Sequence, residues 1–214
     1  GGFKDNSGIK NTFFQRKSLI ENELKQFKQA QSNLRKQLLL ASDDSLGSSD
    51  DSQRYLDKIL MLTEEESPEV SSLGRLVIDA AGILSGTSQD ILLTDGDTII
   101  VPIERQTIKV IGEVYAPNTH FYELNKSPSD YIKLSGGLNE FADDSNIYVI
   151  KQNGSVFNLE SSGGFFRGAS NDLEGGDTIV VPLTISTYSG LKATTEITQI
   201  IYQMALSAAA VNSF

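Results

Sequence analysis

The sequence predicts an α+β protein in which one small module occurs twice, a helical hairpin interrupts the first copy, and an amphipathic helix follows the second. The segment GDTIIVP at residues 96–102 recurs as GDTIVVP at residues 176–182, with six identities in seven positions. Similarity at a fixed offset of 80 residues indicates a repeated structural unit. Apolar residues at helical spacing occupy residues 12–41, and no charged residue follows Glu196. These three observations set the predicted architecture.

The helical hairpin is expected between residues 12 and 63. Residues 12–41 carry apolar side chains every seven positions, the spacing of a helix that packs through one face. These side chains are Phe13, Ile20, Phe27 and Leu34. Polar residues interrupt the alternate heptad position, so we expect a helical arm on one partner rather than a long coiled coil. An acidic linker at residues 42–52 (SDDSLGSSDDS) separates this arm from a second, shorter helix at residues 53–63.

Beyond residue 72 the pattern changes to short runs rich in β-branched residues, which are typical of strands. The predicted strands are residues 76–78, 91–93, 98–101, 108–114, 119–124, 147–151, 155–159 and 178–181. A helical turn is expected at residues 80–84. Asn153-Gly154 predicts a tight hairpin between two of the strands. In both repeat copies the aspartate, Asp97 or Asp177, is expected to accept hydrogen bonds from the amides of its own turn.

A second short helix is predicted inside the second module. Ser127 followed by Pro128 is typical of a helix start, since serine caps the first turn and proline fits the first helical position. Gly136-Gly137 then ends the helix. The chain thus divides into a first, truncated module at residues 1–104 with its insertion at about 12–63, a second module at residues 105–185, and a C-terminal helix at residues 186–214.

The composition excludes several classes of function. The 214 residues include 18 Lys and Arg against 28 Asp and Glu, a net charge of −10, so the chain repels phosphate backbones and we expect no nucleic-acid partner. The absence of cysteine excludes disulfides and thiolate metal sites. One histidine, His120, cannot form a site that needs two imidazoles, and no nucleophile or phosphate-loop motif occurs. We expect no enzyme activity, metal or cofactor.

Several segments resemble the SLBB domain, a soluble-ligand-binding β-grasp module. The matching segments are GRLVID (residues 74–79), both GDT-hydrophobic-VP strands, VIGEVYAP (110–117), DYI (130–132), SGGL (135–138), and AD (142–143) ahead of the strand YVI (148–150). The helical hairpin is similar to an insertion found in members with several SLBB domains. The resemblance implies tandem β-grasp modules and the Wza-type outer-membrane polysaccharide exporters, with this chain forming the C-terminal part of a longer member.

The resemblance also implies a function. Such a chain would be a non-enzymatic component of a bacterial capsular or exopolysaccharide export channel in the periplasm and outer membrane of a Gram-negative bacterium. Its implied partners are the polysaccharide, further copies in a homo-oligomeric ring, and an inner-membrane polysaccharide co-polymerase. The alternative interpretation is a soluble periplasmic carbohydrate-binding module, which would bind a glycan specifically and would not associate with membranes.

Residues 194–214 are expected to form an amphipathic helix about 31 Å long, close to the thickness of a bilayer core. Four polar residues fall within one arc of the helical wheel and apolar residues fill the opposite side. These polar residues are Glu196, Gln199, Gln203 and Ser207. Several copies could form a barrel that is apolar outside and polar inside, as the exporter resemblance implies, with these four residues facing the lumen. The alternative is a helix that packs on its own domain.

A glycine-rich loop supplies the second candidate site. Two aromatic residues and an arginine, Phe165, Phe166 and Arg167, follow two glycines at residues 163–164. Aromatic rings and arginine are typical of surfaces that stack on sugars or contact a neighbouring subunit. The alternative is that one of the phenylalanines fills the small core of the second module.

Overall fold

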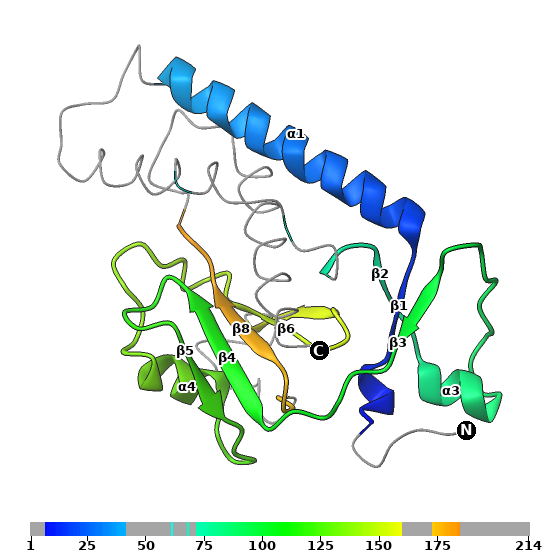
Figure 1. Cartoon of the computed structure of the whole chain (residues 1–214). Coiled ribbons are helices and arrows are strands. Elements are labelled where there is room, and N and C mark those ends of the chain that lie inside the picture. Colours follow the sequence, from blue (N-terminus) through cyan, green and yellow to red (C-terminus); the bar gives the residue numbers. More distant parts are fainter. Residues whose placement is uncertain (1–6, 42–60, 62–67, 69–71, 160–172, 185–214) are drawn as a thin grey trace.

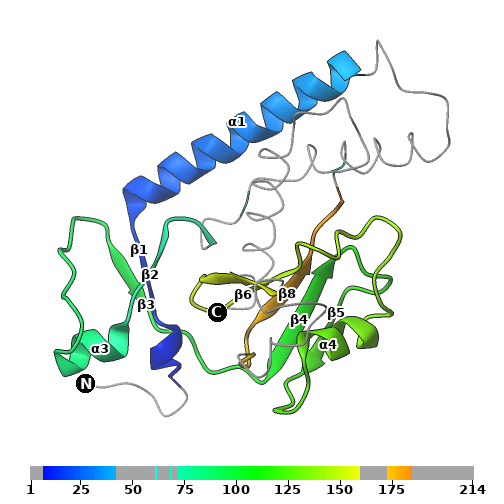
Figure 2. The ribbon, with the colours of Figure 1, turned by 180° about the vertical axis from the view of Figure 1, so that it is seen from behind.

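The computed structural model describes residues 7–41, 61, 68, 72–159 and 173–184 (Figure 1). Within them the chain forms two β-sheets that lie side by side, with a long helix passing them both (Figures 1 and 2). The mixture of helices with two largely antiparallel sheets confirms the predicted α+β class.

The first sheet has three strands in the order β2-β1-β3, and β1 is antiparallel to both neighbours. Its elements are the 3₁₀-helix η1 (Ile9–Asn11), β1 (Phe13–Gln15), α1 (Lys17–Ala41), β2 (Arg75–Val77), α3 (Ala80–Ser85) and β3 (Thr98–Ile100). Phe13 and Phe14 are consecutive residues of the central strand β1. Their side chains project to opposite faces of the sheet, and both are buried. Strand β1 therefore packs on both of its sides.

The helix prediction for residues 12–16 is wrong. These residues contain strand β1, and α1 begins only at Lys17. Phe13 matches the heptad spacing, but its backbone gains hydrogen bonds to a strand on either side, and these tertiary pairings outweigh the local periodicity. From Lys17 onward the helix prediction is confirmed. Phe27, Ala30 and Leu34 form its buried stripe. The predicted second helix, residues 53–63, lies almost wholly outside the described residues.

The second sheet has five strands in the order β5-β4-β8-β6-β7, and β4 and β8 form its parallel pair. Its elements are β4 (Thr107–Gly112), β5 (Asn118–Phe121), α4 (Pro128–Leu134), β6 (Tyr148–Ile150), β7 (Val156–Asn158) and β8 (Thr178–Val181). Helix α4 packs on one face of the sheet and contributes Tyr131 and Ile132 to the core. The same core contains Val149 and Ile179 from the central strands.

Helix α4 begins and ends as predicted. The Ser127 hydroxyl accepts a hydrogen bond from the Asp130 amide, and the Asp130 carboxylate accepts one from the Ser127 amide, which completes a capping box. Pro128 takes the first helical position. Gly136 and Gly137 follow with φ of +85° and +86°, a left-handed conformation that ends the helix at low cost only for glycine.

Three strands of each sheet pair in the same register. Phe14 lies opposite both Leu76 and Ile99 in the first sheet, and Val149 lies opposite both Phe157 and Ile179 in the second. Strands β2-β1-β3 therefore repeat β7-β6-β8 residue for residue. An isolated β-bridge ahead of each middle strand repeats as well. The antiparallel bridge between Ser7 and Ile103 corresponds to the one between Ala142 and Leu183.

The equivalence shows where the helical insertion lies. In the second sheet residues 151–155 connect β6 to β7 as a tight turn around Asn153-Gly154, as predicted. In the first sheet residues 16–74, which include α1, connect β1 to β2. The insertion thus replaces a hairpin turn, a position at which added length leaves the register of the strands unchanged.

Candidate functional site

The residues predicted as sites from the sequence lie outside the described residues. This applies to Phe165, Phe166 and Arg167 and to Glu196, Gln199, Gln203 and Ser207. Among the helices that the structure describes, none is both long enough and apolar enough to cross a membrane. Within the same residues, no three His, Cys, Asp or Glu side chains gather as metal ligands would.

The aspartate of the first repeat anchors its turn. Asp97 accepts hydrogen bonds from the Thr94 amide at 2.7 Å and from the Thr94 hydroxyl at 2.9 Å, as predicted for a turn-forming residue. It also accepts two bonds from the guanidinium of Arg16, at 3.0 and 3.1 Å. The bond from Arg16 is the main reason why the pKa of Asp97 falls to about 2. The carboxylate therefore fastens the end of β1 to the turn before β3.

The second repeat uses the same construction with a different cation. Asp177 accepts a hydrogen bond from the Glu174 amide at 2.8 Å and pairs with the Lys151 ammonium at 2.9 Å. Lys151 directly follows β6, as Arg16 directly follows β1. Burial raises the pKa of Asp177 above its ordinary value, against the lowering effects of the Glu174 amide and Lys151. Both aspartates are therefore structural residues.

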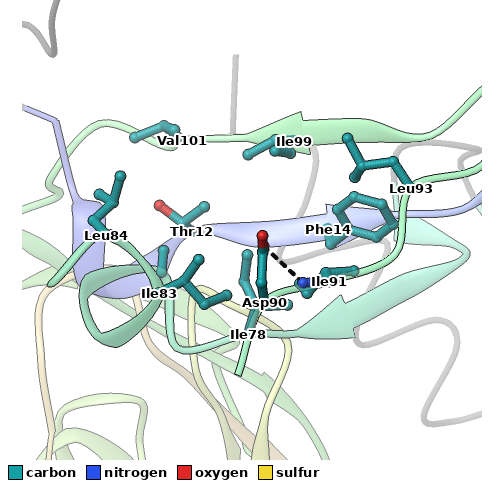
Figure 3. Close-up of a pocket in the computed structure, with 11 residues that line it drawn as sticks. Thr12, Phe14, Ile78, Ile83, Leu84, Asp90, Ile91, Leu93, Ile99 and Val101 are labelled. Atoms are coloured by element: carbon teal, nitrogen blue, oxygen red, sulfur yellow. Dashed lines mark hydrogen bonds between the residues drawn. The ribbon is translucent and has the colours of Figure 1, made fainter. Parts of the chain in front are cut away.

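An apolar hollow of about 270 Å³ opens between the first sheet and α3 (Figure 3). Phe14 lies at its floor, Ile99 and Val101 line one wall, and Ile91 and Leu93 line another (Figure 3). The remaining lining residues are Thr12, Ile78, Ala80, Ile83, Leu84 and Asp90. Ile99 and Leu93 are more than half exposed although they are aliphatic. An exposed apolar surface of this kind is typical of an interaction site.

Polar groups are sparse in the hollow. The Asp90 carboxylate accepts a hydrogen bond from the Ile91 amide, 2.8 Å away (Figure 3). The Thr12 hydroxyl is buried and, within the described residues, has no hydrogen-bond partner. Sugar sites pair aromatic faces with several polar groups, whereas this hollow has one aromatic ring and mostly aliphatic walls. Its chemistry suits the apolar side chains of a polypeptide better than a glycan.

Residues 91–93 were predicted as a strand, and this prediction is wrong. They pair with neither sheet, and Ile91 and Leu93 form a wall of the hollow instead. The sequence predicted a first, truncated module, but it did not show that the truncation leaves an apolar hollow open beside β3. The repeat nevertheless contains a sign of this hollow. Leu93 aligns with Leu173, which is buried in the second module.

His120 has a neighbour that the sequence did not reveal. Its Nε2 lies 2.9 Å from the hydroxyl of Ser135, and its ring lies against Tyr131. A serine–histidine pair could suggest nucleophilic catalysis, but Ser135 is completely buried at the end of α4. A substrate cannot reach this hydroxyl. The contact instead joins strand β5 to α4.

The comparisons with known proteins found relatives that are named as transport proteins. The chain is similar to two polysialic acid transport proteins KpsD of Escherichia coli. It is 32% identical to each over 135 residues, which is 63% of this chain. The match spans only 22% of the length of these relatives. No protein-family model matches the chain.

Proposed function

We propose that this chain is part of a non-enzymatic export channel that carries a capsular polysaccharide across the periplasm and outer membrane of a Gram-negative bacterium. The similarity to KpsD over 135 residues is the observation that carries this proposal. The names of these relatives describe transport of polysialic acid. An anionic glycan of this kind is therefore the substrate class that we propose.

The topology supports the proposed assignment of the second module to the SLBB type of β-grasp. A β-hairpin, β4–β5, leads into helix α4, and the late strand β8 then inserts beside β4 in a parallel orientation. The three-stranded unit β2-β1-β3 would be part of a second copy of this fold. Modules of this kind, stacked in rings of several copies, would line the periplasmic part of the conduit, fed by an inner-membrane co-polymerase.

The direct test is export in a capsulated bacterium that carries the full-length gene. Deletion is expected to remove the polysaccharide from the cell surface while polymer accumulates inside the cells, and re-expression is expected to restore export. Loss of total polymer rather than of surface polymer would contradict the proposal, because it would indicate a role in synthesis. Unchanged surface polymer would also contradict it.

The C-terminal segment has its own test, because the proposed channel crosses the outer membrane through residues 194–214. We expect the whole chain to float with liposomes and a chain that ends at Leu191 to remain behind. The double variant Ile197→Lys/Ile201→Lys keeps the full length of the chain and serves as a matched control, and we expect it to lose flotation. If the whole chain does not float and binds a glycan specifically, the soluble carbohydrate-binding module would be the better account.

A further inference from the structure

The hollow occupies the place that a closed core occupies in the second module. The shared register aligns Ile99 with Ile179, and the repeat aligns Leu93 with Leu173. Ile99 is 57% exposed whereas Ile179 is fully buried, and Leu93 is 62% exposed whereas Leu173 is 4% exposed. The same backbone positions thus carry aliphatic residues in both modules, but only the second module covers them.

The second module shows what provides this cover. Strand β4 lies parallel to β8 along its outer edge and places Ile108 and Val110 in the core. Helix α4 adds Tyr131 and Ile132 to the same cluster. In the first sheet β3 corresponds to β8, but among the described strands its sole neighbour is β1. The first module thus has an open strand edge beside an open apolar face, which together favour the addition of a strand.

The sequence ahead of the first sheet indicates where the missing cover comes from. The Gly8 amide donates to the Pro102 carbonyl at 2.8 Å, as the Asp143 amide donates to the Pro182 carbonyl at 2.9 Å. Extending this alignment backward pairs Gly1-Gly2-Phe3 with Gly136-Gly137-Leu138. The latter segment ends helix α4. The same Gly-Gly-apolar sequence therefore stands at the corresponding position of the first module, where the second module has just completed α4.

We propose that the hollow is the docking surface for a hairpin and helix that directly precede Gly1 in the same polypeptide. The first strand of this segment lies parallel to β3, and its helix covers Phe14, Ile99 and Leu93. Because β4 begins at Thr107 and Gly136 aligns with Gly1, the added strand begins about 29 residues before Gly1. The proposal rests on the repeat and does not depend on the transport function.

The chemistry of the hollow specifies this segment further. Its strand carries apolar side chains at alternate positions, as Ile108 and Val110 do in β4, in order to fill a hollow of about 270 Å³. The buried Thr12 hydroxyl lies at a position where the second module has the apolar Ile147. The segment therefore supplies a hydrogen-bond partner for this hydroxyl, because an unsatisfied buried hydroxyl is destabilising.

Thiol labelling tests the proposal, because the chain contains no cysteine. Single cysteines are introduced by I99C and L93C in two proteins, the 214-residue chain and the same chain extended by its native 40 preceding residues. We expect rapid labelling in the 214-residue chain and labelling at least about tenfold slower in the extended chain. V77C is the matched control, since Val77 is 53% exposed and aligns with the exposed Asn158. Its labelling rate should be equal in both chains.

Two results would overturn the proposal. Equal labelling of I99C and of L93C in the two chains, with both folded by circular dichroism, would show that the preceding residues do not cover the hollow. Slow labelling in the 214-residue chain, accompanied by a dimer in light scattering, would show that a second copy covers it instead. Protection of V77C together with I99C would indicate aggregation and would also count against a specific cover.

Discussion

The strands β2-β1-β3 and β7-β6-β8 share one register and differ in what surrounds them. Both place a cation directly after the middle strand, Arg16 or Lys151, against the aspartate of a GDT turn. In the first module the strong bond with Arg16 lowers the pKa of Asp97 to about 2, whereas deeper burial raises the pKa of Asp177 in the second. The hydrogen-bonded frame is therefore common to both repeats, whereas the pKa of the aspartate depends on its cation partner and on its burial.

The largest predicted difference between the modules concerns two aligned isoleucines. Ile179→Ala removes a fully buried side chain and should lower the free energy of unfolding by about 2–5 kcal/mol. Ile99→Ala truncates an exposed side chain and should change it by no more than about 0.5 kcal/mol. Urea unfolding of both variants measures the difference. Equal losses would show that the first module is closed in this chain.

A pair of glycines tests how closely β4 approaches β8 in the second module. Gly112 and Gly137 have nearly the same φ, +91° and +86°. A Cβ at Gly112 would collide with the Val181 carbonyl oxygen, whereas a Cβ at Gly137 would meet nothing within 4 Å. Gly112→Ala should therefore cost about 2–4 kcal/mol and Gly137→Ala about 1 kcal/mol. Thermal unfolding that ranks the two variants equally would contradict the close approach.

Gln152 joins the turn of the second module to the first and offers a smaller effect. Its side-chain amide donates to the Ile103 carbonyl at 2.9 Å and accepts from Asn11 at 3.1 Å. Gln152→Ala should lower stability by about 1–2 kcal/mol because it removes two bonds, and Asn11→Ala, which removes one, should cost about half as much. Urea unfolding of the two variants and their double mutant measures this coupling. Additive losses would show that the two side chains act independently.

The smallest effect is a difference in pH dependence between the two aspartates. The folded pKa of Asp97 lies below the unfolded one, so its contribution is present above about pH 4 and is lost as the pH falls toward 2. The advantage of the wild type over Asp97→Asn should shrink over that range. The folded pKa of Asp177 is raised, so ionisation of this group opposes folding. The stability of the wild type relative to Asp177→Asn should therefore increase as the pH falls. Thermal unfolding from pH 7 to about pH 2 measures both trends, and parallel trends would contradict the opposite shifts.

Local signals in the sequence predicted what depends on neighbouring residues. The cap at Ser127, the turn at Asn153-Gly154 and the turn bonds of Asp97 and Asp177 are all present in the structure. Strand β1 could not be predicted in this way, because its partners are separated from it by the helical insertion. The Arg16–Asp97 pair depends on that strand and was missed with it.

Less of the candidate site than of the fold could be predicted from the sequence. An apolar residue such as Ile99 predicts burial in any module of this pattern, and nothing in its local sequence states that its cover is absent. Likewise, the contact between His120 and Ser135 joins residues 15 positions apart on a strand and a helix end, a distance that no short motif spans. Both features arise from packing between elements and became visible only in three dimensions.

Hydrogen–deuterium exchange of β3 and β8 in the 214-residue chain measures most directly whether the first module is open. At concentrations at which the chain is monomeric, β8 should be strongly protected, because it has a strand on each side and a closed core above it. Strand β3 should exchange at least about tenfold faster, since its outer edge and the hollow are open. Equal protection of the two strands would contradict the account of one closed and one open module.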